Sequence, residues 1–108
     1  MTQDIDVVIV TFNSRDMTSE CIDHLDDPRI ARIVVVDNAS SDGSEAALRE
    51  RFGDRIELIR LDEGVGFAAA CNRGARAGDA PLVLFLNSDI YTTPGAISLL
   101  ADELERDP

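Results

Sequence analysis

The stretch Leu82-Val83-Leu84-Phe85-Leu86-Asn87-Ser88-Asp89 decides how this sequence folds. Its apolar part is long enough for one buried strand, and polar side chains follow it at once. A continuous apolar run of this length is typical of a parallel strand that is covered on both faces. Ligands of open parallel sheets bind outside the carboxyl ends of the strands. Asn87, Ser88 and Asp89 are therefore expected to line a ligand site.

Strand-then-helix units precede this stretch and one helix follows it. The other predicted strands cover residues 6–11, 33–37 and 56–61, and each is followed by a helical pattern. The last helix is expected to run to about Glu105, with Thr92, Thr93 and Pro94 as its cap and first turn. This alternation predicts right-handed crossovers between parallel strands. We therefore expect an α/β fold: a three-layer, Rossmann-like parallel sheet of four strands in the order 3-2-1-4, with helices on both faces.

The first predicted helix begins after a cap at Asn13 or Ser14. Its apolar face is expected to hold Met17, Cys21, Ile22 and Leu25. Cys21 and Cys71 lie in predicted helices without metal-like spacing, so buried reduced thiols are expected rather than a disulfide. His24 is expected at the surface.

Composition and charge limit the possible functions. The chain has 108 residues, enough for one domain, with 21 acidic residues against 10 basic ones and a net charge of -11. This charge argues against nucleic acid or an anionic membrane as partner, because both require a basic face. An anionic ligand would need a metal ion or a local arginine. No apolar run approaches the roughly 20 residues of a membrane span, so no transmembrane segment and a cytoplasmic location are expected.

Three of the predicted strands end in polar residues that suit nucleotide binding. Asp37 can accept a hydrogen bond from the imide nitrogen of a pyrimidine base, and Thr11 can hold the other edge of that base. Asp89 can bind a divalent cation that bridges two phosphates. Taken singly, Asn13, Asn38 and Ser88 are also ordinary turn formers or helix caps.

A glycine-containing turn follows the third predicted strand. Gly64 and Gly66 permit close approach of the backbone to a ligand, and the start of the following helix favours negative charge. Asn72 and Arg73 lie further along this helix. Arg73 either faces phosphates or is an ordinary solvated residue.

Four motifs in order resemble those of family-two glycosyltransferases, and the rhamnosyltransferase-like subgroup is the most similar. The motifs are VIVTFN at 8–13, VVVDNASSDGS at 34–44, GVGFAAACNRG at 64–74 and LFLNSD at 84–89. The resemblance implies the nucleotide-binding half of a GT-A-type fold, inverting sugar transfer, and a Mg²⁺ or Mn²⁺ ion. It implies that Asn87 and Asp89 occupy the first and last positions of an Asp-x-Asp motif, so Asp89 is the motif's available carboxylate and the expected metal ligand.

The expected partner is a nucleotide-diphosphate sugar of the UDP or TDP type. The expected nucleotide-binding residues are Thr11, Asn13, Asp37, Asn38, Gly66, Asn72, Asn87, Ser88 and Asp89. The acceptor is expected to be a glycan or lipid-linked glycan, such as a cell-wall polysaccharide, with rhamnose as the sugar suggested by the subgroup.

The chain is shorter than the family pattern. Residues 1–108 are expected to form the nucleotide-sugar-binding half, with the acceptor-binding half absent and the general base beyond Pro108. This chain alone is therefore expected to be inactive. A fragment of a longer enzyme is favoured over a stand-alone domain. Exposed apolar residues, including Leu99 and Leu100, would permit a homo-oligomer.

Two other functions fit parts of the sequence. Gly64-x-Gly66-x-x-Ala69, with Asp89 about 20 residues further on, matches a dinucleotide-binding fingerprint and suggests an NAD-binding oxidoreductase domain. That fingerprint belongs in the first strand–helix unit, whereas here it falls in the third. The other alternative is a non-catalytic nucleotide-binding or interaction module of the same fold.

Overall fold

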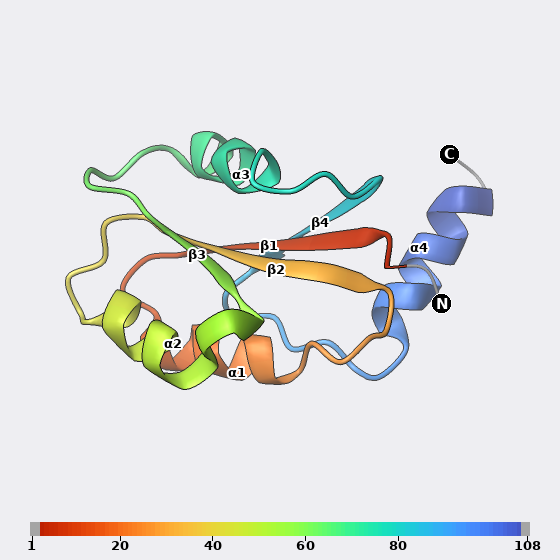
Figure 1. Ribbon diagram of the computed structural model, residues 1–108, viewed down its shortest axis with the longest axis horizontal. Helices are drawn as coiled ribbons and strands as arrows, with labels where there is room; N and C mark the ends of the chain where they lie inside the picture. Colours follow the sequence, from red (N-terminus) through yellow and green to blue (C-terminus); the bar gives the residue numbers. More distant parts are fainter. Residues whose placement is uncertain (1–2, 107–108) are drawn as a thin grey trace.

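The computed structural model describes residues 3–106 as a four-stranded parallel sheet covered by helices (Figure 1). The strand order is β3-β2-β1-β4, and every neighbouring pair is parallel, which confirms the predicted topology. The strands are β1 (Ile5–Thr11), β2 (Ile30–Asp37), β3 (Glu57–Arg60) and β4 (Leu82–Asn87). The helices are α1 (Arg15–Asp23), α2 (Ser44–Phe52), the short 3₁₀ helix η1 (Gly53–Arg55), α3 (Phe67–Ala75) and α4 (Ala96–Arg106).

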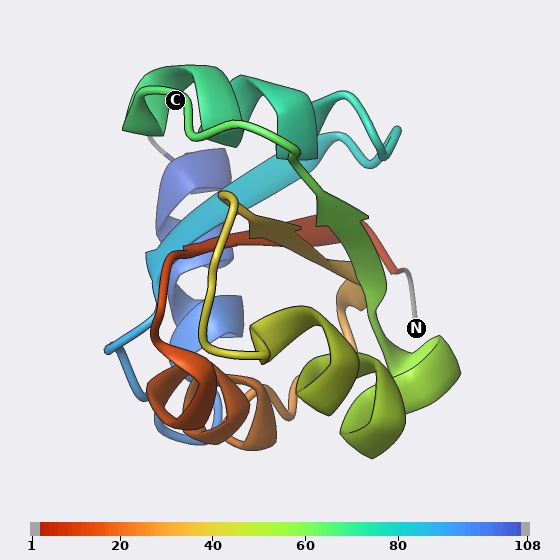
Figure 2. The same cartoon turned by 90° about the vertical axis from the view of Figure 1, so that its left-hand side faces the viewer.

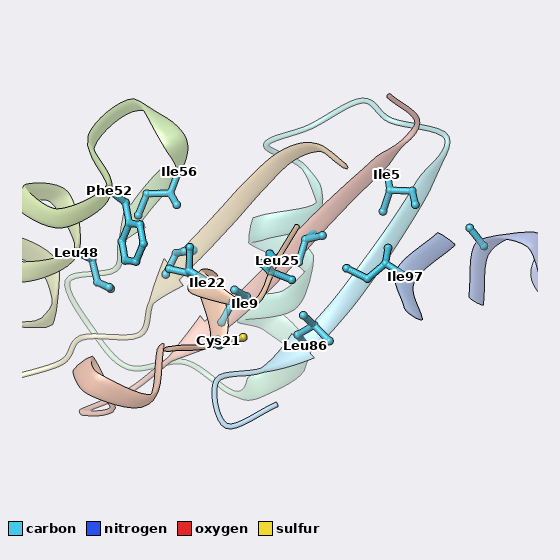
Figure 3. Packing of buried hydrophobic residues seen from close by; sticks show 13 residues of the cluster. Ile5, Ile9, Cys21, Ile22, Leu25, Leu48, Phe52, Ile56, Leu86 and Ile97 are labelled. Atoms are coloured by element: carbon cyan, nitrogen blue, oxygen red, sulfur yellow. The ribbon is translucent and has the colours of Figure 1, made fainter. Parts of the chain in front are cut away.

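Helices lie on both faces of the sheet, as expected. Helix α3 covers one face, and α1, α2 and α4 lie on the other side (Figures 1 and 2). The larger core cluster joins the second face to these three helices, with Ile9 and Leu86 from the sheet and Ile22, Leu48 and Ile97 from the helices (Figure 3). The central strands are apolar on both faces because both are covered.

Helix α3 lies unusually close to the sheet at Gly74. A Cβ atom on Gly74 would lie 2.5 Å from Cγ1 of Val8 and 3.0 Å from Cγ2 of Val36. Ala70, one turn earlier, is fully buried against the same face. Small residues on this side of α3 therefore set its distance from β1 and β2.

Helix α1 differs from its prediction in both its end and its buried face. It ends at Asp23 rather than Leu25, and Met17 is 43% exposed. Thr18 is buried in its place, because the Thr18 hydroxyl is hydrogen-bonded to that of Thr11 at 2.7 Å. Both cysteines are buried and free, as predicted.

Helix α4 begins at Ala96, so the predicted cap and first turn at 92–94 are wrong. The Thr92 hydroxyl instead donates to the carbonyl oxygen of His24 at 3.0 Å. Gly95 has a φ of 84°, in the left-handed region, and separates Pro94 from the helix. The first turn of α4 is capped from outside the helix by Asp27, which accepts hydrogen bonds from the backbone and hydroxyl of Ser98.

The strand boundaries also shift slightly. Strand β2 begins at Ile30 rather than Ile33, because its first residues pair with the start of β1. Strand β3 is short and lies at an edge of the sheet, as predicted from its alternating pattern. Within the part of the chain that the structure describes, no helix has the length and apolar character needed to cross a bilayer.

Candidate functional site

The carboxyl ends of β1, β2 and β4 meet at one edge of the sheet, and this edge faces the viewer in Figure 2. In the parallel register Thr11 lies level with Asp37, and Val10 lies level with Asn87. Because β1 lies between β2 and β4, the ends of these outer two strands are about 10 Å apart. The sheet therefore brings the predicted residues after these strands to a common edge.

Thr11 is fully buried and its oxygens have protein partners. Its hydroxyl is bonded to that of Thr18, and its carbonyl oxygen accepts a hydrogen bond from the backbone N–H of Asn38 at 2.9 Å. Thr11 therefore joins the end of β1 to α1 and to the turn after β2, and its side chain does not reach the surface.

Asp37 is also fully buried, and it organises the turn that follows β2. Its Oδ1 accepts a hydrogen bond from the backbone N–H of Ser40 at 3.0 Å. Its Oδ2 is paired with Nη1 of Arg60 at 3.0 Å, and the same Nη1 donates to the Ser40 carbonyl oxygen at 2.8 Å. Sequence reasoning missed Arg60. The parallel register of β2 and β3, which places Arg60 level with Asp37, is the signal that identifies it.

Asn38 joins this turn to the glycine-containing loop before α3. Its Nδ2 donates to the carbonyl oxygen of Val65 at 2.8 Å, and its Oδ1 accepts from the Val65 N–H at 2.9 Å. Both backbone hydrogen-bonding groups of Val65 are thus satisfied by one side chain. The two loops are consequently fixed beside each other at the site edge.

Asn13 makes a similar connection from the end of β1. Its φ is 49°, its N–H donates to Oγ of Ser40 at 2.9 Å, and its Oδ1 accepts from the Ser41 N–H at 2.7 Å. Asp42 completes the turn by accepting hydrogen bonds from the hydroxyl and N–H of Ser44. The Ser44 hydroxyl, chiefly, holds the pKa of Asp42 below its ordinary value.

The space next to Gly64 and Gly66, in the loop before α3, is free of other atoms of the described residues. Gly66 is the N-cap of α3 and has a φ of -61°, and a Cβ atom on Gly64 or Gly66 would have no neighbour within 4 Å. Neither a left-handed backbone nor packing within the described residues requires glycine at these positions. Asn72 and Arg73 are exposed on α3.

The turn after β4 presents Asn87 and Asp89 to solvent, with Ser88 half-buried between them. The Asn87 carbonyl oxygen closes this turn by accepting from the Ile90 N–H at 3.1 Å. Burial, and then the nearby charge of Asp89, raise the pKa of Cys21 to about 11. Among residues 3–106, the Asp89 carboxylate has neither a hydrogen bond nor an ion pair.

Asp89 suits a cation that arrives with phosphates. The described part of the chain has no group of three or more acidic, histidine or cysteine side chains placed to hold a metal. Mg²⁺ at nucleotide sites is commonly bound by one or two carboxylates together with substrate phosphates and water. A free carboxylate at a strand end fits such a shared site, and it does not fit a site built from protein ligands alone.

A parallel sheet of this order, with helices on both faces and polar loops gathered at its carboxyl edge, defines the chain as a three-layer, Rossmann-like α/β domain. The chain belongs to Glycosyl transferase family 2, whose sequence model matches residues 6–108. This confirms the family resemblance carried by the four motifs.

Individual relatives and solved structures are similar to this chain over nearly its whole length. The succinoglycan biosynthesis protein ExoU of Rhizobium meliloti is 28% identical over 103 residues, which cover 93% of this chain and 30% of that protein. A mannosyltransferase from Pyrobaculum calidifontis, solved with GDP-Man and Mn²⁺, is 28% identical with a TM-score of 0.77 over 97% of this chain and 32% of its own. S. aureus TarS shares the fold, with a TM-score of 0.80 and 23% identity over 98% of this chain and 33% of its own. The chain thus spans about a third of the length of each of these three proteins.

Proposed function

We propose that this chain is the nucleotide-sugar-binding portion of an inverting glycosyltransferase. It would bind a UDP- or TDP-sugar with Mg²⁺ or Mn²⁺, for transfer of the sugar to a glycan or lipid-linked acceptor. The observation that carries the proposal is the exposed Asp89 carboxylate, which has no partner among residues 3–106 and lies at the same sheet edge as the loops after β1 and β2. A cation there would offset the repulsion between a protein of charge -11 and a diphosphate.

The pyrimidine base of the nucleotide is proposed to lie against the turn after β2. The hydrogen bonds of Asn13 and Asn38 fix the loops on either side of this position. Thr11 and Asp37 support these loops from beneath, because both are fully buried. A direct hydrogen bond from a base to Asp37 would require movement of the turn that contains Ser40.

The diphosphate is proposed to extend from this turn toward β4. Gly64 and Gly66 would allow its close approach, since no protein atom lies where their Cβ atoms would be. Asn87 and Ser88 offer further polar groups at this edge, and Asn72 is proposed to contact the ligand from the exposed side of α3. A cation held by Asp89 would stabilise the diphosphate leaving group as the sugar–oxygen bond breaks.

The acceptor side of the reaction is proposed to depend on residues outside 1–108. The general base that deprotonates the acceptor hydroxyl is assigned there, and this chain alone is proposed to bind the donor without transferring it. The names of two relatives refer to succinoglycan and teichuronic acid biosynthesis, which supports a surface or cell-wall polysaccharide as acceptor. Rhamnose remains the donor sugar suggested by the motif subgroup.

A dinucleotide site is less well supported by the structure. The turn Gly64 to Gly66 follows β3, which is an edge strand, whereas dinucleotides bind where the strand order reverses. In this sheet the reversal lies between β1 and β4. The NAD-binding alternative therefore has its glycines at the wrong strand.

Isothermal titration calorimetry with UDP, TDP, GDP and NAD tests these alternatives. We expect UDP or TDP to bind at least tenfold more tightly with Mn²⁺ than with EDTA. NAD binding in EDTA would overturn the proposal in favour of the oxidoreductase alternative. If a longer protein that joins residues 1–108 to an acceptor-binding half binds UDP in a metal-dependent way but transfers no sugar from labelled UDP-sugars, a non-catalytic module would be supported instead.

A further inference from the structure

The segment that carries Asp89 is attached to the end of α1 on both sides of that residue. Before Asp89, the Cys21 thiol contacts the Asn87 carbonyl oxygen at 3.9 Å. After it, the rings of His24 and Tyr91 stack, with centroids 4.9 Å apart and an interplanar angle of 16°. The Thr92 hydroxyl also donates to the His24 carbonyl oxygen at 3.0 Å. We call the stack and this last hydrogen bond the His24 clasp.

The ring of His24 is itself held in place. Its Nδ1 lies 2.7 Å from the carbonyl oxygen of Glu20, within hydrogen-bond distance. This contact ties the ring to the last turn of α1, so the stack is attached to a rigid helix. The clasp therefore connects a fixed element to residues two and three positions after Asp89.

We propose that the His24 clasp positions the Asp89 carboxylate for the metal–diphosphate. This inference rests on the proposed function, in which Asp89 holds the cation. Asp89 has no partner of its own among residues 3–106, so its placement depends on the backbone on either side. A ligand that must order a loop binds more weakly than one that meets a loop already in place. His24 and Tyr91 are thus positioning residues, and neither is proposed to touch the nucleotide.

A purely structural role for the stack is separable from this one. Tyr91 is 44% exposed and His24 is also exposed, so their removal leaves the buried core unchanged. If they only stabilise the fold, their loss would affect nucleotide binding equally with and without a metal. If they position Asp89, their removal should weaken UDP binding in the presence of the metal and leave UDP binding in EDTA unchanged.

The test measures UDP affinity of the full chain by calorimetry, in Mn²⁺ and in EDTA. We expect Tyr91→Ala and His24→Ala each to weaken binding in Mn²⁺ by about three- to tenfold, the range that loss of an aromatic stack implies. Binding in EDTA should stay within twofold of the wild type. Tyr91→Phe keeps the stack and removes only the hydroxyl, which is hydrogen-bonded to the Glu20 side chain, so the affinity should stay within twofold of the wild type. The double alanine variant should be no weaker than either single one, because both remove the same contact.

Two further variants link the effect to Asp89. In an Asp89→Asn background, Tyr91→Ala should change UDP binding in Mn²⁺ by less than twofold. Leu104→Ala, which removes an exposed apolar side chain from α4, should leave binding unchanged in the wild-type background. Hydrogen exchange should quicken at residues 88–93 in Tyr91→Ala and not in Tyr91→Phe.

The outcomes separate this inference from the proposed function. If the wild type binds UDP equally in Mn²⁺ and EDTA, the metal role of Asp89 is wrong and the inference fails with it. If the wild type shows the metal effect and both alanine variants keep it, the proposed function stands and the inference alone is overturned. Equal losses in Mn²⁺ and EDTA would also overturn the inference.

Discussion

Arg60 on the edge strand β3 donates hydrogen bonds both to the buried Asp37 carboxylate, at 3.0 Å, and to the carbonyl oxygen of Ser40, at 2.8 Å. The Arg60 side chain is 33% exposed, whereas the Asp37 side chain is fully buried. A single guanidinium therefore compensates a buried charge and fixes the turn after β2. The shape of the proposed base site depends on this pair.

Removal of Arg60 should destabilise the fold. Arg60→Met leaves the Asp37 charge buried without its cation, and we expect a loss of about 2–3 kcal/mol in the free energy of unfolding. Urea denaturation followed by circular dichroism measures this loss. Arg49→Met is the matched control, because Arg49 pairs with Glu45 on the surface of α2 and should cost less than about 0.5 kcal/mol. Equal effects of the two changes would show that the Asp37 pair is unimportant.

Gly74→Ala should destabilise the protein although alanine is the better helix former. The added Cβ would lie 2.5 Å from the Val8 side chain, so α3 or β1 must shift. Such overpacking costs about 1–3 kcal/mol and exceeds the roughly 1 kcal/mol gained in helix propensity. A melting temperature at or above that of the wild type would contradict this close approach.

Gly66→Ala should reduce nucleotide binding while leaving the stability of the fold nearly unchanged. No atom of the described chain lies within 4 Å of the added Cβ, and the φ of -61° is open to alanine. Glycine is preferred over alanine at an N-cap, whereas alanine lowers the entropy of the unfolded chain, so these opposing effects should change stability by less than about 1 kcal/mol. If the diphosphate passes close to this backbone, UDP affinity in Mn²⁺ should fall by about tenfold or more. Unchanged affinity in calorimetry would place the diphosphate elsewhere.

Asp89→Asn should abolish the effect of Mn²⁺ on UDP binding and leave the fold intact. The side chain is exposed and has no partner among residues 3–106, so the melting temperature should stay within a few degrees. Glu50→Gln is the control, since it removes one exposed charge on α2. Persistence of the Mn²⁺ effect in Asp89→Asn would remove Asp89 from the metal site.

Acid should weaken the fold partly through Asp4 and Asp42. A hydrogen bond from Arg29 holds the pKa of Asp4 below its ordinary value, and one from the Ser44 hydroxyl does the same for Asp42. Lowered folded-state pKa values stabilise the fold above the unfolded value of about 3.9. This contribution is lost as the pH falls from about 4 through the lower folded values. The free energy of unfolding of Asp42→Asn should therefore depend less steeply on pH below 4, whereas an unchanged slope would contradict the assignment.

The topology of the sheet could be predicted from the sequence because the topology depends on a simple pattern. Apolar strands alternate with helical segments, and this alternation alone predicted the order 3-2-1-4 and the gathering of polar strand ends. The phase of a helix was harder to predict. Met17 and Thr18 are adjacent, and the buried one is the polar Thr18, whose hydroxyl is hydrogen-bonded to that of Thr11, so the apolar pattern alone pointed to the wrong residue.

The role of individual site residues was also less predictable. A polar side chain at a strand end can turn outward to a ligand or inward to a partner. Asp37 turns inward because Arg60 lies beside it, and this pairing depends on a register that a single sequence does not specify. His24 was expected to be an ordinary surface residue. Its contact with Tyr91 joins residues far apart in the chain, so no local pattern indicated it.

Strand β4 has β1 on one side and no described strand on the other, and its Phe85 side chain is 46% exposed. Its free N–H and C=O groups are a template for pairing with a strand from another molecule. At neutral pH the charge of -11 keeps such molecules apart by mutual repulsion. Close to the isoelectric point of about 4.2 this protection vanishes, so mildly acidic storage would invite sheet-edge aggregation before the domain itself unfolds.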